Sequence, residues 1–505
     1  MKKIYFDIKE LKKITSKLKK KKKIVLCHGV FDLLHIGHIK HFQEAKKHGQ
    51  LLIVSVTPDR YVNKGPLKPA FTEKLRLESI AAIGIVDFVY LNDAKSSVKV
   101  IEEIKPNIYC KGIEYKNFKE DISGLIKEEV SAVKKINAKI IYTKDITFSS
   151  SKLINQNSSF GTQHNTNIGN IKKNYSFKKI KDVIEKFKSN KILIIGETII
   201  DKYVFCEALG KSGKEPVLVL RDLQTEEYLG GAAVISRHLS NFCNKISVLS
   251  MVGEKGEYLK KIKKELPKNV NFRYIKKKNS PTILKRRFLD KVGNHKVLGV
   301  YKINDDILEK NEERNFNKIL TNLLPKFDLV IVSDYGHGLI SKNSAKIICK
   351  LSKYLALNAQ VNAANIGYHS LRNYKNVDSV IINSTELRQN LRDKNEKLEV
   401  LMKKFAKNQN IKKLVVTRGD QGSILYSTKE KKLTYCSPYA TKAVDKIGAG
   451  DAMLSLMSLC LQAKLNNDFS LLFGSLAAAQ SVESIGNQQS INKTSILKSL
   501  ENMLK

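Results

Sequence analysis

The spacing of apolar residues predicts a βαβ unit near the start of the chain. Apolar positions at helical spacing in residues 4–20 predict an amphipathic helix. Residues 24–27 and 51–56 are short apolar runs typical of buried strands, and a helical pattern through Phe42 and Ala45 lies between them. The corner between the first of these strands and its helix is the edge at which open parallel sheets bind ligands.

Apolar runs in the second half predict another α/β domain with an additional antiparallel pair of strands. A helix at about residues 177–188 leads into a buried strand at 191–197, and a second buried strand follows at 329–333. Residues 283–288 and 297–303 alternate between apolar and polar side chains and are joined around Gly293, which predicts paired strands. The two halves differ in pattern, so we find no internal repeat.

The stretch between the halves, residues 155–174, is rich in Asn, Gln, Ser and Thr. It has too few apolar side chains to fold alone, so it predicts a disordered linker. We therefore expect one domain at residues 1–155 and another at 177–505, joined by a polar linker at 156–176. The two domains should fold and act separately.

Composition narrows the classes of partner. The 505 residues include 90 Lys and Arg against 49 Asp and Glu, for a formal net charge of +41. A nucleic-acid binder should cluster its cations among exposed aromatics, whereas these lysines are dispersed, so we expect no nucleic-acid partner.

The seven scattered cysteines form no C-x-x-C pair and suit reduced thiols rather than zinc or disulfides. No apolar run has membrane-spanning length, so we expect a cytoplasmic protein without a membrane partner.

Two histidines at the first strand-to-helix corner are candidate catalytic residues. His35 and His38 are three positions apart at the predicted start of a helix, so both can point at one phosphate, and Gly37 leaves room for it. A metal pair is one alternative, but no carboxylate or cysteine cluster nearby completes a metal site. A structural role in the core is the other.

The sequence around these histidines, G-x-F-D followed by H-x-G-H, resembles the nucleotidyltransferase superfamily of glycerol-3-phosphate cytidylyltransferase. The resemblance covers about residues 22–155 and includes a K-G-x-x-Y loop at Lys111. It implies that a sugar phosphate attacks the α-phosphorus of ATP or CTP, with Mg²⁺ bridging the phosphates. For Lys64 and Arg76, which the resemblance implies bind phosphate, the alternative is that they are surface charges in contact with solvent. The residues implied to bind the nucleotide are Gly29, Phe31, Lys64, Arg76, Ser149, Ser150 and Ser151, the last standing where Thr is usual.

The stretch 445–451 carries the main candidate site of the second half. Gly448, Ala449 and Gly450 precede an apolar helix, so backbone N–H groups can approach an anion there. Asp451 is placed to accept a proton from a hydroxyl that attacks a phosphoryl group. A glycine-rich turn capped by an aspartate is the alternative.

This stretch resembles the signature of the ribokinase-like, PfkB-type sugar kinases, whose final Asp is the catalytic base, and the resemblance spans about residues 190–490. It implies a small β-lid that covers the sugar and pairs subunits, and hence a homodimer. Asp201 is implied to bind sugar hydroxyls, with a turn cap as the alternative, and Asn383 and Glu386 are implied to organise Mg²⁺ through water. The remaining implied residues are Gly230, Gly231 and Asp334 for the sugar, and Thr417, Gly419, Gly422, Gly448, Ala449 and Gly450 for the nucleotide.

Several positions depart from the kinase pattern. Val234 replaces an Asn, His337 replaces a Lys, and Asn362 and Ala364 replace an acid and a Lys. The sugar therefore stays open. The choice between ATP and CTP also stays open, because residues 28–31 read H-G-V-F where the common bifunctional heptose-phosphate enzymes have N-G-C-F.

We expect two α/β domains, a Rossmann-like nucleotidyltransferase and a ribokinase-like kinase with a β-lid. The expected enzyme phosphorylates a sugar phosphate, such as a heptose 7-phosphate, at the anomeric position and then activates the product as a nucleotide sugar. The alternative is an active transferase beside a degenerate kinase half.

Overall fold

The computed structural model describes residues 2–62, 65, 68–116, 121, 124–143, 161–360, 365, 369–440 and 443–504. The chain forms two compact units, one of residues 1–159 with 494–505 and one of residues 160–493. No helix within these described ranges is long and apolar enough to cross a membrane. All seven cysteines lie in the described part of the chain and are free thiols, as predicted.

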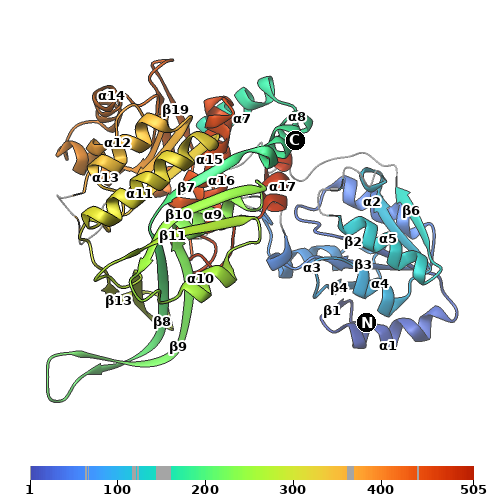
Figure 1. The fold of residues 1–505 in the computed structure, drawn as a ribbon. Helices are drawn as coiled ribbons and strands as arrows, with labels where there is room; N and C mark the ends of the chain where they lie inside the picture. The colour runs from blue at the N-terminus through green and yellow to red at the C-terminus, as the bar shows by residue number, and fades with distance from the viewer. Residues whose placement is uncertain are drawn as a thin grey trace. The chain divides into compact units, whose positions relative to one another are not determined.

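The first unit is a parallel α/β domain (Figure 1). Its six strands pair in parallel in the order β1-β4-β3-β2-β5-β6. Its elements are β1 (Ile4–Tyr5), α1 (Ile8–Lys19), β2 (Ile24–Gly29), α2 (Ile36–Lys46), β3 (Leu51–Val56), α3 (Glu73–Ala81), β4 (Phe88–Leu91), α4 (Val98–Ile104), β5 (Ile108–Gly112), α5 (Leu125–Lys135), β6 (Lys139–Thr143) and the C-terminal α17 (Lys493–Leu504).

The predicted helix at residues 4–20 begins later than expected. Ile4 and Tyr5 instead form β1 beside β4. The Asp7 side chain accepts a hydrogen bond from the N–H of Lys9 at 2.9 Å, which caps α1. Asp7 therefore separates a short strand from a helix that periodicity alone had merged.

Alternate side chains of the first sheet build two core layers. Leu26 on β2 packs in the layer that includes α1, α4 and α5, whereas Val25 and Cys27 pack in the layer of α2 and α3. From β2 the chain proceeds to β3 and β4 on one side and later to β5 and β6 on the other. The carboxyl end of β2 is therefore a topological switch point, where such sheets bind ligands.

The second unit contains a nine-stranded sheet and a four-stranded sheet. The orders are β11-β10-β7-β14-β15-β16-β17-β18-β19 and β13-β12-β8-β9. The strands are β7 (Lys191–Gly196), β8 (Thr198–Lys211), β9 (Leu218–Gly231), β10 (Lys245–Gly253), β11 (Val270–Lys277), β12 (Leu284–Asp290), β13 (Lys296–Lys302), β14 (Leu329–Asp334), β15 (Leu355–Ala359), β16 (Ser379–Asn383), β17 (Lys413–Thr417), β18 (Ser423–Ser427) and β19 (Lys432–Cys436).

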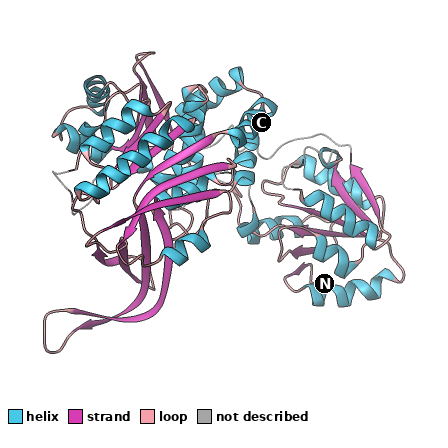
Figure 2. Ribbon diagram, viewed as in Figure 1, coloured by secondary structure: helices cyan, strands magenta, loops and turns pink. Residues whose placement is uncertain are grey.

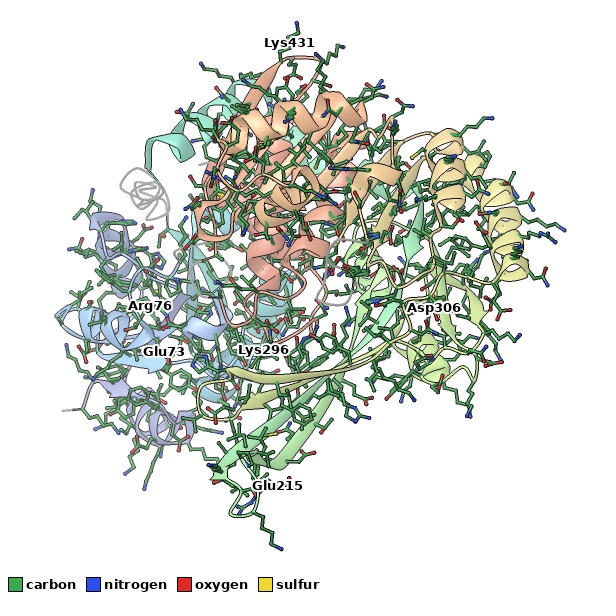
Figure 3. The ribbon with its side chains drawn as sticks, turned by 90° about the vertical axis from the view of Figure 1, so that its left-hand side faces the viewer. Glu73, Arg76, Glu215, Lys296, Asp306 and Lys431 are labelled. Atoms are coloured by element: carbon green, nitrogen blue, oxygen red, sulfur yellow. The ribbon has the colours of Figure 1, made fainter. Side chains whose placement is uncertain are left out.

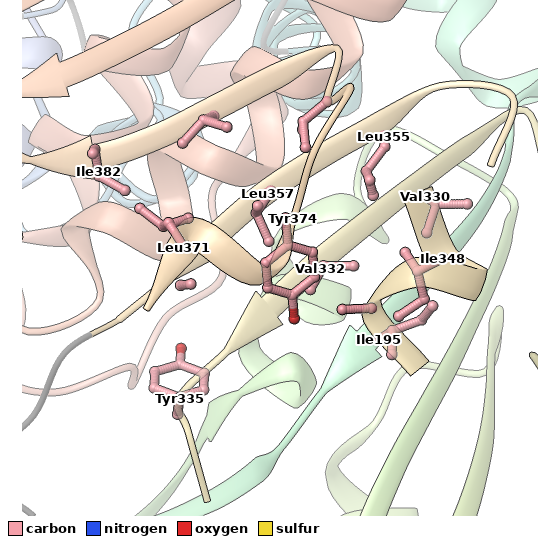
Figure 4. Close-up of a cluster of buried hydrophobic side chains, with 14 of the residues drawn as sticks. Ile195, Val330, Val332, Tyr335, Ile348, Leu355, Leu357, Leu371, Tyr374 and Ile382 are labelled. Atoms are coloured by element: carbon pink, nitrogen blue, oxygen red, sulfur yellow. The ribbon is translucent and has the colours of Figure 1, made fainter. Parts of the chain in front are cut away.

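Helices cover both faces of the large sheet (Figure 1). They are α7 (Gly161–Asn174), α8 (Phe177–Lys186), α9 (Ala232–Leu239), α10 (Leu259–Glu265), α11 (Lys310–Leu323), α12 (Lys342–Leu351), α13 (Ser384–Leu391), α14 (Leu398–Gln409), α15 (Ala449–Gln462) and α16 (Asn467–Ser481). Val330 and Val332 share a core with side chains of α11 to α14, part of which Figure 4 shows, while α15 packs on the strands from the other face. The strands β7, β14, β15, β16 and β17 lie side by side and parallel in this sheet. Their carboxyl ends share one edge, where the predicted kinase residues gather.

The four-stranded sheet is the predicted β-lid. β12 and β13 pair antiparallel, as the alternating pattern predicts. β8 and β9 form a hairpin of two 14-residue strands, which reaches well beyond the rest of the sheet, with Glu215 at its tip (Figures 2 and 3). We refer to the sheet β13-β12-β8-β9 as the lid sheet.

The prediction of a disordered linker is wrong for residues 161–174, which form α7, and residues 155–160 lie outside the described residues. Ile168 and Ile171 are buried, and α7 packs against α16 and β19. Two apolar residues three positions apart make one stripe on a helix, and the rest of the fold covers it. The predicted end of the second domain at residue 505 also differs from the structure, because residues 494–505, which belong to α17, are part of the first unit.

We expect a protein of residues 160–493 to fold alone and to melt at a higher temperature than residues 176–493. The shorter protein loses α7, and burying each isoleucine contributes roughly 1.5–3 kcal/mol. Thermal melts followed by circular dichroism measure the difference. Equal melting temperatures would show that α7 is dispensable, and an insoluble longer protein would contradict independent folding.

Candidate active sites

The two histidines lie at the carboxyl end of β2. His35 is the N-cap of α2, and its Nδ1 accepts a hydrogen bond from the N–H of Gly37 at 3.1 Å, which leaves the proton of the neutral ring on Nε2. The His38 ring stacks on His35 with centroids 4.0 Å apart and meets the Phe31 ring edge-on at 5.4 Å. The pair is thereby held at a helix N-terminus, where an anion is favoured.

Gly29 and Phe31 shape the same corner. Phe31 has a φ of 51°, in the left-handed region, and its ring turns back over Gly29. A Cβ atom at Gly29 would lie 3.0 Å from that ring, which is too close without a shift. A larger residue at position 29 would therefore require the Phe31 ring, which supports His38, to move by a few tenths of an ångström.

The predicted contact between Arg76 and the nucleotide requires correction. The Arg76 side chain is fully buried, donates to the carbonyls of Phe71 at 3.0 Å and Thr57 at 2.9 Å, and pairs with Asp59 at 2.5 Å. It therefore joins the segments that follow β3 rather than facing a ligand. The other predicted phosphate-binding side chains, Lys64, Ser149, Ser150 and Ser151, lie outside the described residues.

A buried ion pair next to the histidine corner was not predicted. Lys111, at the end of β5, lies 3.0 Å from Glu129 of α5, and its Nζ donates to the carbonyl of His28 at 3.4 Å. Burial alone would raise the pKa of Glu129, but Lys111 and His28 outweigh it and lower that pKa to about 2. Burial and the Lys111 charge lower the pKa of His28 to about 4, so His28 is neutral near pH 7.

In the second unit, Asp451 lies in the first turn of α15 and is half-buried. Burial raises the pKa of its carboxyl to about 7, and the Tyr335 hydroxyl donates to Oδ1 at 2.8 Å. A carboxyl with a pKa near working pH is suited to accept a proton from an attacking hydroxyl. Gly448 precedes it with a φ of 88°, and a Cβ atom there would lie 2.0 Å from Asn487 Oδ1.

Asp445, six residues earlier, has a carboxyl pKa shifted in the opposite direction. Burial would raise its pKa, but hydrogen bonds from Lys296 at 2.6 Å, from the Ile447 N–H and from the Gly486 N–H outweigh burial and lower it. Two acids in one segment thus have pKa values pushed apart, as in sites that assign one acid to proton transfer. Lys296, on β13, also ties the lid sheet to this turn.

Asp201 lies on β8 of the lid sheet, with only 4% of the residue exposed. It forms an ion pair with Arg287 of β12, and a Cβ atom at Gly230 would lie 2.5 Å from Asp201 Oδ2. Gly231 has a φ of 62° and closely approaches the carbonyl of Glu197. The predicted sugar residues Asp201, Gly230 and Gly231 are therefore adjacent, and Asp201 is not a turn cap.

Asp334 is buried at the end of β14. Its Oδ2 accepts the Tyr374 hydroxyl at 2.6 Å and its Oδ1 accepts the Gly336 N–H at 3.0 Å, with only 3% of the residue exposed. These bonds fix the turn after β14, and the sugar contact of Asp334 stays a prediction. Figure 4 shows Tyr335 and Tyr374 at this end of the core.

Asn383 and Glu386 form a capping box at the start of α13. Asn383 Oδ1 accepts the Glu386 N–H and Glu386 Oε2 accepts the Asn383 N–H, each at 2.8 Å. Within the described ranges no group of three His, Cys, Asp or Glu side chains could hold a metal ion. One carboxylate and one amide suit Mg²⁺ that keeps its waters and is bound chiefly by nucleotide phosphates.

The predicted nucleotide turn follows β17. Thr417 ends this strand, and the Arg418 N–H donates to the Gly422 carbonyl at 2.8 Å, which closes a tight turn. Gly419 and Gly422 have positive φ values, and a Cβ atom at Gly422 would lie 2.0 Å from the Cys436 carbonyl. This turn and the start of α15 offer backbone donors to a nucleotide.

Residues 189–494, more than half of the chain, match the model of the pfkB family of carbohydrate kinases. The chain belongs to this family. Residues 26–157 match the cytidylyltransferase-like family. A crystal structure of phosphofructokinase-2 from Escherichia coli in complex with potassium superposes on the chain with a TM-score of 0.51 at 15% identity, covering 62% of this chain and 99% of that one. This likeness confirms the predicted ribokinase-like fold.

Curated relatives of the chain include proteins named Bifunctional protein HldE. The one from Campylobacter jejuni (strain RM1221) is 26% identical over 300 residues, which are 59% of this chain and 62% of that protein. The one from Citrifermentans bemidjiense is 39% identical over 111 residues, or 22% of each chain. The chain thus spans about 62% of the length of the first of these relatives.

Two departures of the kinase domain from the family pattern lie within the described residues. Val234 is fully buried on α9 and serves the core. His337 is also buried, and its Nδ1 lies 2.6 Å from Asp305 Oδ1. The other two, Asn362 and Ala364, lie outside the described residues.

Three side chains that lie beside the predicted residues Asp451 and Asp201 were missed in the sequence. Tyr335 donates to Asp451, Arg287 pairs with Asp201, and Lys285 is buried beside them. Lys285 and Arg287 are two positions apart in the predicted strand 283–288. Since positions i and i+2 of a strand share a face, this spacing was the available signal that both cations lie on one side of the sheet.

We expect the phosphorylation rate of the kinase domain, as kcat/KM, to fall below about pH 7, because Asp451 must be deprotonated to accept a proton. The Tyr335 hydrogen bond favours the charged carboxylate and so lowers its pKa. Tyr335→Phe should therefore move this acidic limb to higher pH. A pH–rate profile measures the shift, and an unmoved limb would show that Asp451 is not the titrating group.

Proposed function

We propose that the chain is a bifunctional enzyme that phosphorylates a sugar phosphate at its anomeric hydroxyl and then joins the product to a nucleotide. The observation that carries this proposal is the presence, in one chain, of a carboxyl with a raised pKa at Asp451 and a stacked histidine pair at the switch point of β2. The similarity to proteins named Bifunctional protein HldE supports the pairing of the two activities.

In the kinase step, the deprotonated Asp451 accepts the proton of the sugar hydroxyl as that oxygen attacks the γ-phosphorus of ATP and ADP leaves. The backbone N–H groups at the start of α15 stabilise charge on the transferred phosphoryl group. When Mg²⁺ is bound it neutralises phosphate charge, and Asn383 and Glu386 would hold it through water.

In the transferase step, the sugar 1-phosphate is itself the nucleophile, so no protein base is needed. Its oxygen attacks the α-phosphorus of ATP or CTP, and pyrophosphate leaves. His35 and His38 donate to phosphate oxygens as negative charge grows on them. The role of the protein is to position two anions in line.

We further propose that the enzyme is a homodimer. The β8–β9 hairpin and the loop that joins its strands expose apolar side chains whose burial would favour association. These side chains are Leu209, Val217, Leu218, Val219 and Leu223.

A second candidate is an active transferase beside a degenerate kinase, which the burial of Val234 in the core favours. A ³¹P NMR and mass-spectrometric screen of heptose and hexose phosphates with ATP and CTP separates the two. Formation of a sugar bisphosphate and then a nucleotide sugar supports both activities. A nucleotide sugar formed only from supplied sugar 1-phosphate supports the second candidate, and no product from any substrate refutes both.

A further inference from the structure

A cavity of about 900 Å³ lies at the amino ends of β7, β10 and β11, beside the end of α11. We refer to it as the amino-edge cavity. Lys191 is the first residue of β7 and Lys245 is the first of β10, and the two are in register in neighbouring parallel strands. The predicted kinase residues gather at the carboxyl edge of the same sheet, so this cavity is separate from the site of Asp451.

One face of the sheet changes character along these three strands. Toward the carboxyl end, Leu193, Leu249 and Ile275 belong to the core that α11 shares. Side chains two positions apart on a strand share a face, so the same face carries polar and cationic groups toward the amino end. These groups, all of which line the cavity, are Lys191, Lys245, Ser247, Asn271 and Arg273. The face that packs on α11 elsewhere is therefore left open here and is lined by hydrogen-bond donors.

The charge of the amino-edge cavity is of one sign. Among the residues that the structure describes, four cations and no acid line it, and the cations are Lys191, Lys245, Arg273 and Lys326. None of these four side chains makes a hydrogen bond, or an ion pair within 4.0 Å, with another described residue. Asp328, two positions after Lys326, instead accepts the backbone N–H of Lys191 at 3.1 Å. Four unpaired positive charges around one hollow concentrate a field that favours an anion.

The size and the remaining lining of the cavity indicate what kind of anion it suits. Ile246, Ile319, Leu323 and Phe327 add apolar surface to it. Pockets for small organic ligands measure roughly 300–1,000 Å³ and combine apolar walls with a few polar groups, whereas an inorganic phosphate would fill only part of this space. The Arg273 guanidinium can bind two phosphate oxygens at once, and the lysines act as point charges.

We propose that the amino-edge cavity binds an organic anion that carries two or more phosphate groups and a flat ring, which is the chemistry of a nucleoside diphosphate. The cations would meet the phosphates, and the apolar side chains would meet the ring. This site is additional to the two proposed active sites. It needs neither proposed reaction, because its residues lie at the opposite edge of the sheet from Asp451.

Lysine footprinting on the full chain tests the site, with ADP as the probe. Acetic anhydride acetylates accessible amines, and mass spectrometry reads each lysine separately, so ADP bound at an active site does not obscure the result. The reactivity of Lys191, Lys245 and Lys326 should fall together as ADP is added, with one half-saturating concentration. Lys318, which is exposed on α11 and does not line the cavity, should keep its reactivity.

Two matched variants locate the binding. Arg273→Met should raise the half-saturating ADP concentration for protection of the cavity lysines about 10-fold, as expected for the loss of a hydrogen bond between charged groups. Arg273→Lys keeps the charge and should recover part of the loss. Lys318→Met removes one positive charge outside the cavity and should leave the concentration unchanged. Both native side chains are exposed, so the variants should fold.

Other outcomes overturn the inference. Unchanged reactivity of the three cavity lysines at high ADP concentration would show that the cavity does not bind this class of ligand. Equal protection of Lys318 would show general screening of surface charge. Inorganic pyrophosphate carries the phosphates without the ring, so it should protect only at a higher concentration than ADP. Equal protection by both would mean that the ring contributes nothing and that the cavity is not a nucleoside diphosphate site.

Discussion

Replacing Asp451 with Asn is expected to lower the rate of ATP-dependent sugar phosphorylation by about 10²–10⁴-fold, the usual contribution of a general base. The amide keeps the shape of the carboxyl but cannot accept the proton of the sugar hydroxyl. The Tyr335 hydroxyl still finds an oxygen acceptor, so the pocket should stay assembled. Single-turnover phosphorylation measured by ³¹P NMR gives the rate.

Three controls separate chemistry from folding in this variant. ATP affinity should be retained, because the backbone donors at the start of α15 are unchanged. The melting temperature at pH 8 should not fall, since in the wild type the raised pKa makes ionised Asp451 a cost to the folded state at that pH. Pyrophosphate release from supplied sugar 1-phosphate should match the wild type. Unchanged phosphorylation would remove Asp451 from the mechanism.

Replacing His38 with Ala is expected to lower pyrophosphate release by about 10²–10³-fold, the usual loss for one donor aimed at developing charge. The side chain stacks on His35 and touches Phe31, so it sits at the corner rather than inside the core. His38→Asn keeps an N–H donor and should recover part of the rate. The assay uses ATP and CTP in turn with a heptose 1-phosphate.

The melt of the His38→Ala protein decides between a catalytic and a structural histidine. A folded but slow protein supports the catalytic role. Full activity would refute that role, and a protein without a cooperative melt would show that the stacked pair holds the β2–α2 corner together. Kinase activity of the same variant should be unchanged, because His38 belongs to the first unit and Asp451 to the second.

The two pKa extremes within the segment 445–451 also suggest why its two acids are not interchangeable. Asp445 is kept ionised by Lys296 and backbone N–H groups, whereas burial raises the pKa of Asp451 to about 7. The first acid ties the lid sheet to the glycine-rich turn, and the second can exchange a proton. Identical side chains thus acquire different roles from their surroundings.

Much of this protein could be read from its sequence because the relevant interactions are local. The histidine pair depends on a strand, a turn and a helix start within a few positions, and Asp451 follows its glycines directly. Strand periodicity likewise located β2, β3, β7 and β14 and the lid pair β12 and β13, but not the long β8–β9 hairpin. Such features arise from backbone geometry and side-chain alternation, which neighbouring residues determine.

Only the tertiary structure decided which polar groups face a ligand and which are consumed by the fold. Tyr335 and Asp451 are 116 positions apart, and Arg287 and Asp201 are 86 apart, so no local pattern pairs them. Burial turned Arg76 from a predicted ligand contact into an internal hydrogen-bonding partner. Burial also raised the pKa of Asp451, because desolvation depends on everything packed around a group and not on its neighbours in the chain.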